Sequence, residues 1–235
     1  MIINKRHIQT ATGYKVKVCK SCKSTFDKIG GNDVIIALSQ KNGAGRGEHT
    51  FFSPPGGLYI VQRERNVIDP HTLTPAVGLA VHDAVKAVTG RHTQLKWVND
   101  VIYNDKKIAG ILVRSPRPNE YLIGVGVNYF TDARAFEKVG LFDAGSLGAD
   151  VTTASAFCAE LISRIRLAAR ESFNYHKYTA LCRTIGKNIS FVRDGVNLEG
   201  YAESIERDGS LIVRIGSATV AVDAGEVSIV RESGN

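Results

Sequence analysis

Residues 96–113 read KWVNDVIYNDKKIAGILV, two strand-like runs on either side of an Asn-Asp pair at positions 104 and 105. Such a pair between alternating runs is typical of a two-residue hairpin turn. With that turn, Ile102 opposes Lys107, and Asp100 lies diagonal to Lys107 on the same face of the sheet. Lys96 shares that face by alternation. Because the return strand is strongly apolar, charges beside it usually have a partner, although a solvated ion pair is the alternative.

Strand and helix patterns on both sides of this hairpin indicate an α+β body. Apolar runs with the length of strands occur at residues 15–19, 34–38, 58–62 and 121–128. Helical periodicity marks residues 154–173 and residues 74–89, the latter with Thr74 as N-cap and Pro75 at the first helical position. The N-terminus begins almost directly with strand-like sequence, which leaves no room for a helix-turn-helix module.

The character of the sequence changes after Gly186. Short alternating runs, separated by Asp-Gly and Gly-Ser turns, occur at residues 189–192, 199–205, 211–215, 218–222 and 228–230. Five short strands in so few residues predict a small β-barrel. We therefore expect two domains, a body of residues 1–184 and a C-terminal domain of residues 185–235.

Composition and charge exclude several classes of protein. The chain has 235 residues, of which 43% are hydrophobic and 23% charged, so it can fold around a large core. It contains no run of about 18 apolar residues for a membrane span and opens without a signal-peptide pattern. The net charge of +7 suggests an anionic partner. Basic residues form no block, stripe or tail, which argues against specific DNA binding.

The four cysteines indicate a reducing cytoplasm rather than a disulfide scaffold. Cys19 and Cys22 form a lone CxxC pattern. A structural zinc site would need a second pair at similar spacing, which Cys158 and Cys182 do not supply. We therefore expect no metal site, two thiols at the end of a strand, and two cysteines in the core.

Two glycine-rich segments are suited to binding a ligand through the backbone. Residues 40–47 read QKNGAGRG, in which glycines allow close approach, amides attract anions and Arg46 adds a forked cation. An ordinary surface loop is the alternative, and no Gly-Lys-Ser/Thr ends it as in a Walker loop. Residues 124–128 read GVGVN, and alternate glycines in a buried strand leave space above the sheet for another group. Asn128 either ends the strand as a turn residue or binds a phosphate, a ribose or metal-bound water.

Residues 96–101, 107–113 and 124–128, in this order, resemble the biotin protein ligase family. Ser24-Thr25, the loop at residues 40–46 and FSPPGGLY at residues 52–59 are further matches. Residues 186–229 are similar to the family's small C-terminal domain, and the resemblance extends over residues 15–232. It is to the short class, which lacks a DNA-binding domain. It implies an α+β fold, with a central mixed β-sheet and flanking helices of the class II synthetase-like biotin/lipoate ligase core, plus a small C-terminal SH3-like β-barrel.

The resemblance also implies a two-step reaction. Biotin and ATP form biotinyl-5′-AMP and pyrophosphate, and a lysine of a biotin carboxyl carrier domain then takes the biotinyl group. Mg²⁺ would bridge the phosphates rather than occupy a protein cage. The implied partner is the carrier domain, with no DNA and no membrane, and an exposed strand edge offers a route to a homodimer.

Matching positions imply the residues of the site. Catalysis is expected from Lys107, Arg46 and Asp100, of which Asp100 would orient or deprotonate the acceptor amine. Biotin is expected to contact Ser24, Thr25, Phe26, Gln40, Gly43, Ala44, Gly45, Arg46, Lys107 and Gly110. The nucleotide is expected to contact Arg46, Phe51, Lys96, Asn99, Lys107 and Asn128.

The chain departs from the family pattern in the loop, which usually carries several arginines. In this chain Arg46 is the arginine that remains in the loop. Ala44, Gly47 and His49 occupy three positions where the family usually has arginine. Phe26 stands where asparagine is usual and Arg114 where glutamate is usual. The depleted arginines motivate an alternative, a degenerate paralogue that binds biotin or its adenylate without efficient transfer. A related lipoyl or octanoyl transferase is a further alternative, which residues 96–100 and the C-terminal strands disfavour.

Overall fold

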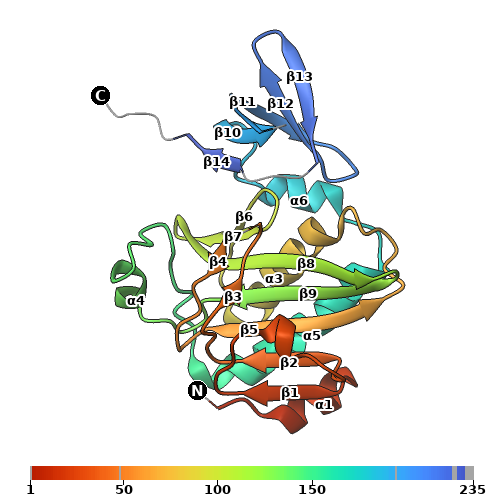
Figure 1. The fold of residues 1–235 in the computed structure, drawn as a ribbon, viewed down its shortest axis with the longest axis vertical. Helices are drawn as coiled ribbons and strands as arrows, with labels where there is room; N and C mark the ends of the chain where they lie inside the picture. Colours follow the sequence, from red (N-terminus) through yellow and green to blue (C-terminus); the bar gives the residue numbers. More distant parts are fainter. Residues whose placement is uncertain (1, 48, 194, 224–226, 231–235) are drawn as a thin grey trace.

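A seven-stranded mixed sheet forms the centre of the computed structural model, which describes residues 2–47, 49–193, 195–223 and 227–230 (Figure 1). The strand order is β1-β2-β5-β9-β8-β7-β6; β1 and β2 are parallel, and every other neighbouring pair is antiparallel. The strands are β1 (Val16–Cys19), β2 (Val34–Ala37), β5 (Leu58–Arg65), β6 (Gln94–Lys96), β7 (Asp100–Tyr103), β8 (Lys106–Arg117) and β9 (Glu120–Val127). The expected central mixed sheet is thus confirmed.

Helices cover one face of this sheet. Helix α3 (Leu73–Thr89) packs against α5 (Ala154–Arg170), and α1 (Lys5–Thr12) packs against α5. Figure 1 shows α3 and α5 behind the strands. Aliphatic side chains from both layers, such as Val81 and Ile123, form the main core. None of the helices in the described ranges is long and apolar enough to cross a membrane.

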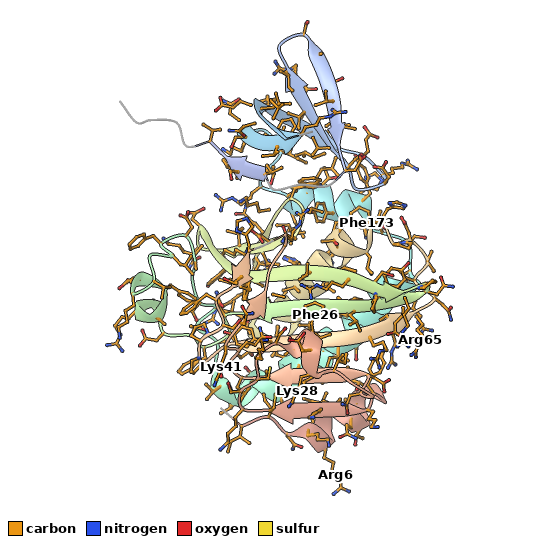
Figure 2. All side chains as sticks on the ribbon, in the orientation of Figure 1. Arg6, Phe26, Lys28, Lys41, Arg65 and Phe173 are labelled. Carbon is orange, nitrogen blue, oxygen red and sulfur yellow. The ribbon has the colours of Figure 1, made fainter. Side chains whose placement is uncertain are left out.

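The other face carries short elements that frame a site. They are α2 (Thr25–Lys28) and the two-residue strands β3 (Gly43–Ala44) and β4 (Thr50–Phe51). Beyond β9 lie α4 (Ala133–Glu137) and a 3₁₀ turn η1 (Val151–Thr153). Figure 2 shows Phe26, a residue of α2, in front of the sheet. The sheet therefore separates the main core from this face.

Helix boundaries differ from the sequence expectation. Helix α3 begins at Leu73 with Thr72 rather than Thr74 in the N-cap position, so Pro75 is the third residue of the helix. The side chain of Thr72 instead donates to Asp69, 2.8 Å away. Helix α5 ends at Arg170, earlier than expected. The expectation of a strand-like N-terminus was wrong, because residues 5–12 form α1.

The hairpin at residues 104–105 is confirmed, but the run before it is not one strand. Ile102 pairs with Lys107 as expected. Residues 97–99 form a turn between β6 and β7, so that Lys96 pairs directly with Asp100. The turn brings Trp97 into contact with the C-terminal part of the chain. Its backbone N–H donates to the Thr184 hydroxyl (2.9 Å), and its indole N–H donates to the carbonyl of Gly209 (2.9 Å).

The C-terminal residues form a five-stranded antiparallel sheet in the order β13-β12-β11-β10-β14. Its strands are β10 (Asn188–Arg193), β11 (Val196–Ile205), β12 (Leu211–Ile215), β13 (Ala218–Val222) and β14 (Val227–Ile229). All five overlap the runs expected from sequence. Helix α6 (Tyr175–Leu181) lies between this sheet and the body (Figure 1). The division at residues 184/185 stays a prediction, because side chains of both parts share one continuous core.

Candidate active site

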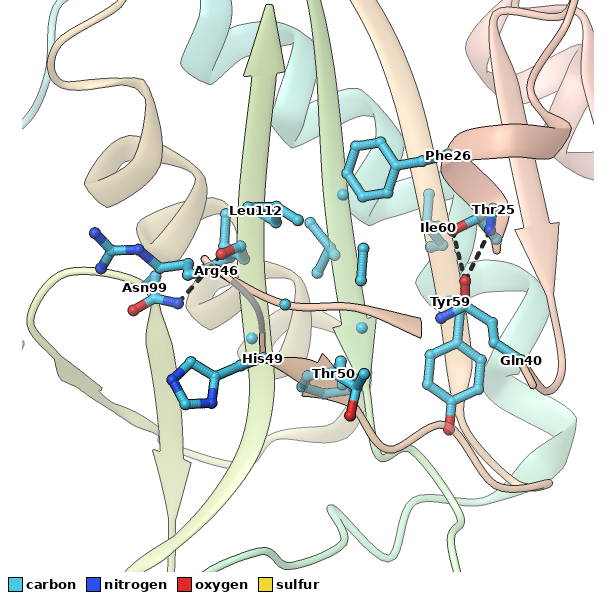
Figure 3. A pocket seen from close by; sticks show the side chains of 18 of the residues that line it. Thr25, Phe26, Gln40, Arg46, His49, Thr50, Tyr59, Ile60, Asn99 and Leu112 are labelled. Atoms are coloured by element: carbon cyan, nitrogen blue, oxygen red, sulfur yellow. Dashed lines mark hydrogen bonds between the residues drawn. The ribbon is translucent and has the colours of Figure 1, made fainter. Parts of the chain in front are cut away.

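The first cavity lies on the sheet face opposite α3 and α5. It has a volume of about 640 Å³, part of it open to solvent. Its walls come from α2, the segment of residues 40–51 and the middle strands of the sheet (Figure 3). Ten residues expected from sequence line it: Thr25, Phe26, Gln40, Ala44, Gly45, Arg46, Phe51, Asn99, Lys107 and Gly110. The chain segments that carry the motifs therefore meet at one place.

Two aromatic rings lie directly on the glycine floor of this cavity. A Cβ atom added to Gly124 would lie 2.5 Å from the ring of Phe26. The same addition at Gly126 or Gly110 would lie 2.7 or 2.9 Å from the ring of Phe51. The alternate glycines leave space above the sheet, as expected, and these rings fill it. The room that the sequence assigned to a ligand at Gly110 is here taken by Phe51.

A polar network fixes the end of the cavity nearest α2. The side-chain carbonyl of Gln40 accepts from the Thr25 backbone N–H (2.8 Å) and hydroxyl (2.9 Å). Its amide donates to Ser53 Oγ (3.0 Å). Ser24 is buried beside this network rather than in the wall, and its hydroxyl has no hydrogen-bond partner among the described residues. A buried, unpartnered hydroxyl is a place where a ligand can supply the missing partner.

Lys107 and Asp100 form a close ion pair. Lys107 Nζ lies 2.6 Å from Asp100 Oδ1, which confirms the contact expected from the hairpin register. Lys107 Nζ also lies 5.8 Å from the centre of the Phe51 ring, within reach of a cation–π attraction. Asp100 is 13% exposed and lines neither of the cavities described here. Asp100 therefore reaches the first cavity through Lys107.

A second cavity of about 690 Å³, including its open mouth, adjoins the first. It is lined by Thr50, Phe51, Phe52, Lys107, Asn128, Phe136 and residues 140–144. Thr50, Phe51 and Lys107 belong to both cavities. The Asn128 amide donates to the carbonyl of Gly145 (2.9 Å), while its own side-chain oxygen is buried without a hydrogen-bond partner among the described residues. Asn128 thus offers an acceptor at this second cavity.

Besides Ser24 and Asp100, two more expected site residues lie outside both walls. Gly43 is packed against the chain, because an added Cβ would lie 2.4 Å from Phe51 O and from Ser53 Oγ. Lys96 is half-buried opposite Asp100. The expected contacts of Gly43 with biotin and of Lys96 with the nucleotide stay predictions, because neither residue lines a cavity described here.

Sequence reasoning missed several wall residues. In the first cavity they include His49, Thr50, Tyr59, Ile60, Ile111, Leu112 and Val125. The Tyr59 hydroxyl donates to the Pro54 carbonyl (2.8 Å), and burial raises the pKa of Tyr59. Strand alternation could have found Leu112, which shares a face with Gly110. No motif marks Phe136 or residues 140–144 of the second cavity.

The described residues contain no cluster of three or more metal-ligating side chains. Cys19 and Cys22 are half-buried at the end of β1, while Cys158 and Cys182 are in the core as expected. Burial and the neighbouring Cys19 thiol raise the pKa of Cys22 to about 11. Cys22 forms a parallel bridge with Gln40, so this turn helps to position the polar network.

Comparison with known proteins identifies the class. Residues 20–128 match the model of the biotin/lipoate A/B protein ligase family. The chain is 32% identical over 224 residues to the biotin–[acetyl-CoA-carboxylase] ligase of Mycobacterium tuberculosis, covering 85% of this chain and 80% of that relative. It is 25% identical over 223 residues to the bifunctional ligase/repressor BirA of Escherichia coli, covering 87% and 69%. The fold and site define a biotin/lipoate ligase core, and within that class the chain belongs to the biotin protein ligase family.

Solved structures support the same fold. The biotin protein ligase of Aquifex aeolicus in complex with biotin and ATP superimposes with a TM-score of 0.77 at 20% identity, covering 93% of this chain and 99% of that one. A Helicobacter pylori biotin acetyl coenzyme A carboxylase synthetase gives a TM-score of 0.61 at 19% identity. Both structural matches cover most of the chain, so they agree with the expected fold of a ligase core followed by a C-terminal sheet.

Proposed function

We propose that this protein activates biotin with ATP as biotinyl-5′-AMP and transfers the biotinyl group to a lysine of a biotin carboxyl carrier domain. The observation that carries this proposal is the position of Lys107, which borders both cavities. The first cavity would hold biotin and the second the nucleotide. The two reacting groups then meet at the one cation that both cavities share among their described lining residues.

In the first step, an oxygen of the biotin carboxylate attacks the α-phosphorus of ATP. A new P–O bond forms, the bond to the bridging oxygen breaks, and pyrophosphate leaves. Two anions must approach each other, so a fixed positive charge between them lowers the barrier. Lys107 supplies that charge, and Arg46 in the cavity wall adds a second cation. Mg²⁺ would accompany the phosphates of ATP, with the Asn128 side-chain oxygen available to the nucleotide or its hydration shell.

In the second step, the acceptor amine attacks the carbonyl carbon of the mixed anhydride and AMP leaves. The nitrogen gives up one proton to solvent as the amide forms, and AMP leaves with the electron pair of the broken C–O bond. Asp100 contacts Lys107 at 2.6 Å and lines neither cavity, which favours a role in holding Lys107 over a role as the acceptor's base. The segment of residues 40–51 covers the first cavity and would keep water from the anhydride.

The test is the mass of a carrier domain after incubation with the protein, ATP and either biotin or lipoate. We expect a gain of one biotinyl group with biotin and no gain with lipoate. A carrier with its acceptor lysine replaced by arginine is the control. Gain with lipoate alone would identify a lipoyl transferase. Adenylate formation without any gain of mass would identify the degenerate paralogue.

A further inference from the structure

Phe26 forms the end wall of the first cavity on the side of α2. Its ring edge lies against Gly124, where an added Cβ would be 2.5 Å from the ring. Behind the ring is a small apolar cluster, separate from the main core, made of Ile29, Ile35, Val61 and Leu122. The ring therefore separates the cavity from this cluster. Figure 3 shows Phe26 and Thr25 at one end of the cavity and Arg46 and Asn99 at the other.

Arg114 holds this wall from the solvent side. Its guanidinium carbon lies over the Phe26 ring, 4.6 Å from the centroid. Arg114 is an exposed residue of β8, paired across the sheet with Leu122 of the small cluster. A guanidinium stacked on an aromatic face is attracted to it and restricts the motion of the ring.

The orientation of the substrate follows from the charge of the site and rests on the proposed function. A carboxylate that reacts beside Lys107 places the rest of the acid in the first cavity, between Lys107 and the Thr25–Gln40 network at the α2 end. Lys107 lies over Gly110, because its Cε would be 3.4 Å from a Cβ added there. The bicyclic ring of biotin then extends toward Thr25, Gln40 and Phe26. Polar groups of the ring can meet the Thr25–Gln40 network, while its apolar face meets Phe26.

We propose that Phe26, held in place by Arg114, determines which ring system the first cavity accepts. Phe26 contacts the substrate ring and blocks added groups at that end. Arg114 touches Phe26 rather than substrate, so it is a positioning residue. An aromatic wall favours a flat, apolar surface and should exclude a bulkier substrate ring at this end of the cavity.

The test is biotin-dependent exchange between pyrophosphate and ATP, with biotin and with biotin methylated on a ureido nitrogen. For Phe26→Ala we expect the KM for biotin to rise about thirtyfold, with the KM for ATP unchanged. Discrimination against the methylated analogue should fall about tenfold. Arg114→Ala should raise the KM for biotin about threefold, and Arg114→Lys should restore part of it.

Controls separate this proposal from a folding defect and from failure of the proposed function. Arg117→Ala, on the same strand and paired with Glu120, should leave all constants unchanged. Phe26→Leu keeps an apolar side chain and should give an intermediate KM if Phe26→Ala does not fold. Absence of exchange in the unaltered protein would overturn the proposed function itself. The proposed role of Phe26 would be wrong if the unaltered protein is active but the KM for biotin changes less than twofold in both Phe26→Ala and Arg114→Ala. It would also be wrong if these variants lose activity only through kcat.

Discussion

Lys107 occupies the most consequential position of any side chain in the site. Of the three residues that border both cavities, Thr50 and Phe51 are uncharged and Lys107 carries a cation. The carboxylate of Asp100 fixes that cation at 2.6 Å, and the Phe51 ring lies nearby. A charge held before the reactants arrive needs little reorganisation in the transition state, which is why such groups contribute strongly to catalysis.

Lys107→Ala should reduce biotinyl-adenylate formation by about 10²–10³ in kcat, as loss of one preorganised charge does elsewhere. The protein should remain folded, because the Lys107 side chain is 35% exposed. Pyrophosphate exchange measures the rate and circular dichroism the fold. The matched control is Lys106→Ala, whose ammonium instead contacts the carbonyl of Phe142. Near wild-type exchange by Lys107→Ala would remove Lys107 from the catalytic role.

The arginine-poor loop gives a second prediction. Ala44 lines the first cavity beside Arg46, so Ala44→Arg can add a forked contact to the adenylate. A hydrogen bond to a charged group contributes about 1.5–3 kcal/mol, which would slow release of biotinyl-5′-AMP about ten- to a hundredfold. Arg46→Ala should accelerate it. Stopped-flow measurement of release from both variants decides the matter, and unchanged release from Ala44→Arg would mean that the loop has sufficient cations.

The segment of residues 40–51 is the element that closes over the first cavity. Residues 40–42 are anchored by backbone hydrogen bonds to Ser53, Cys22 and Lys23. Among the described residues after them, Gly43 pairs with Phe51 and Ala44 with Thr50. Beyond that, one tight turn joins Gly45, Arg46 and His49 through two backbone hydrogen bonds of 2.9 Å each. Few bonds hold the segment beyond Asn42, so opening of that part is inexpensive in free energy.

We therefore expect hydrogen exchange to be fast at Gly43 and Ala44 in the ligand-free protein and slow when biotin and ATP are bound. Amides of β9, in the centre of the sheet, serve as the internal control and should be protected in both states. Equal protection of Gly43 with and without ligand would indicate a fixed scaffold instead of a closing element.

Much of the fold follows from local patterns, and the misses have physical causes. The strands of the body and the C-terminal sheet were predictable because their apolar runs are bounded by turn residues. Helix α1 was missed because it has eight residues and buries two of them, Ile8 and Thr12, which is too short a stretch to reveal a helical repeat. The turn at residues 97–99 was missed because its residues alternate like a strand. The contacts that favour the turn come from Thr184 and Gly209, far along the chain.

The site was predictable where one motif brings its own residues together. Lys107 and Asp100 are such a case, since the hairpin predicts them to be diagonal neighbours on one face of the sheet. The second cavity was not predictable in the same way, because Phe136 and residues 140–144 reach Asn128 through tertiary packing. Occupation of the glycine floor by Phe26 and Phe51 also depends on loop placement, which alternation within a strand does not determine.

At the scale of the whole molecule, the body and the C-terminal sheet are joined around Trp97. Its indole donates to Gly209 O, its backbone donates to Thr184 Oγ1, and Arg183 N donates to Leu95 O (2.8 Å). The side chain is 2% exposed. The Trp97–Gly209 bond thus links the body to the C-terminal sheet, and the other two bonds hold the segment that leads into that sheet. Because the two sheets also share a continuous apolar core, we expect them to unfold together.

Trp97→Phe should lower the free energy of unfolding by about 1–3 kcal/mol, because it leaves the buried Gly209 carbonyl without its donor. Urea denaturation followed by circular dichroism measures this change. Tyr103→Phe, which removes a hydroxyl from a half-buried ring, is the control and should change the free energy by less than about 0.5 kcal/mol. Two separate transitions in the unaltered protein would contradict the shared junction.

Trp97 is also the one tryptophan of the chain. Tryptophan fluorescence excited at long ultraviolet wavelengths therefore comes from one place, the junction between the body and the C-terminal sheet where Trp97 lies. When the indole is shielded from water its emission maximum lies at shorter wavelength, and entry of water at this junction shifts the maximum to longer wavelength. The protein thus carries a built-in optical reporter of how its C-terminal sheet sits on the body, readable during turnover and without a label.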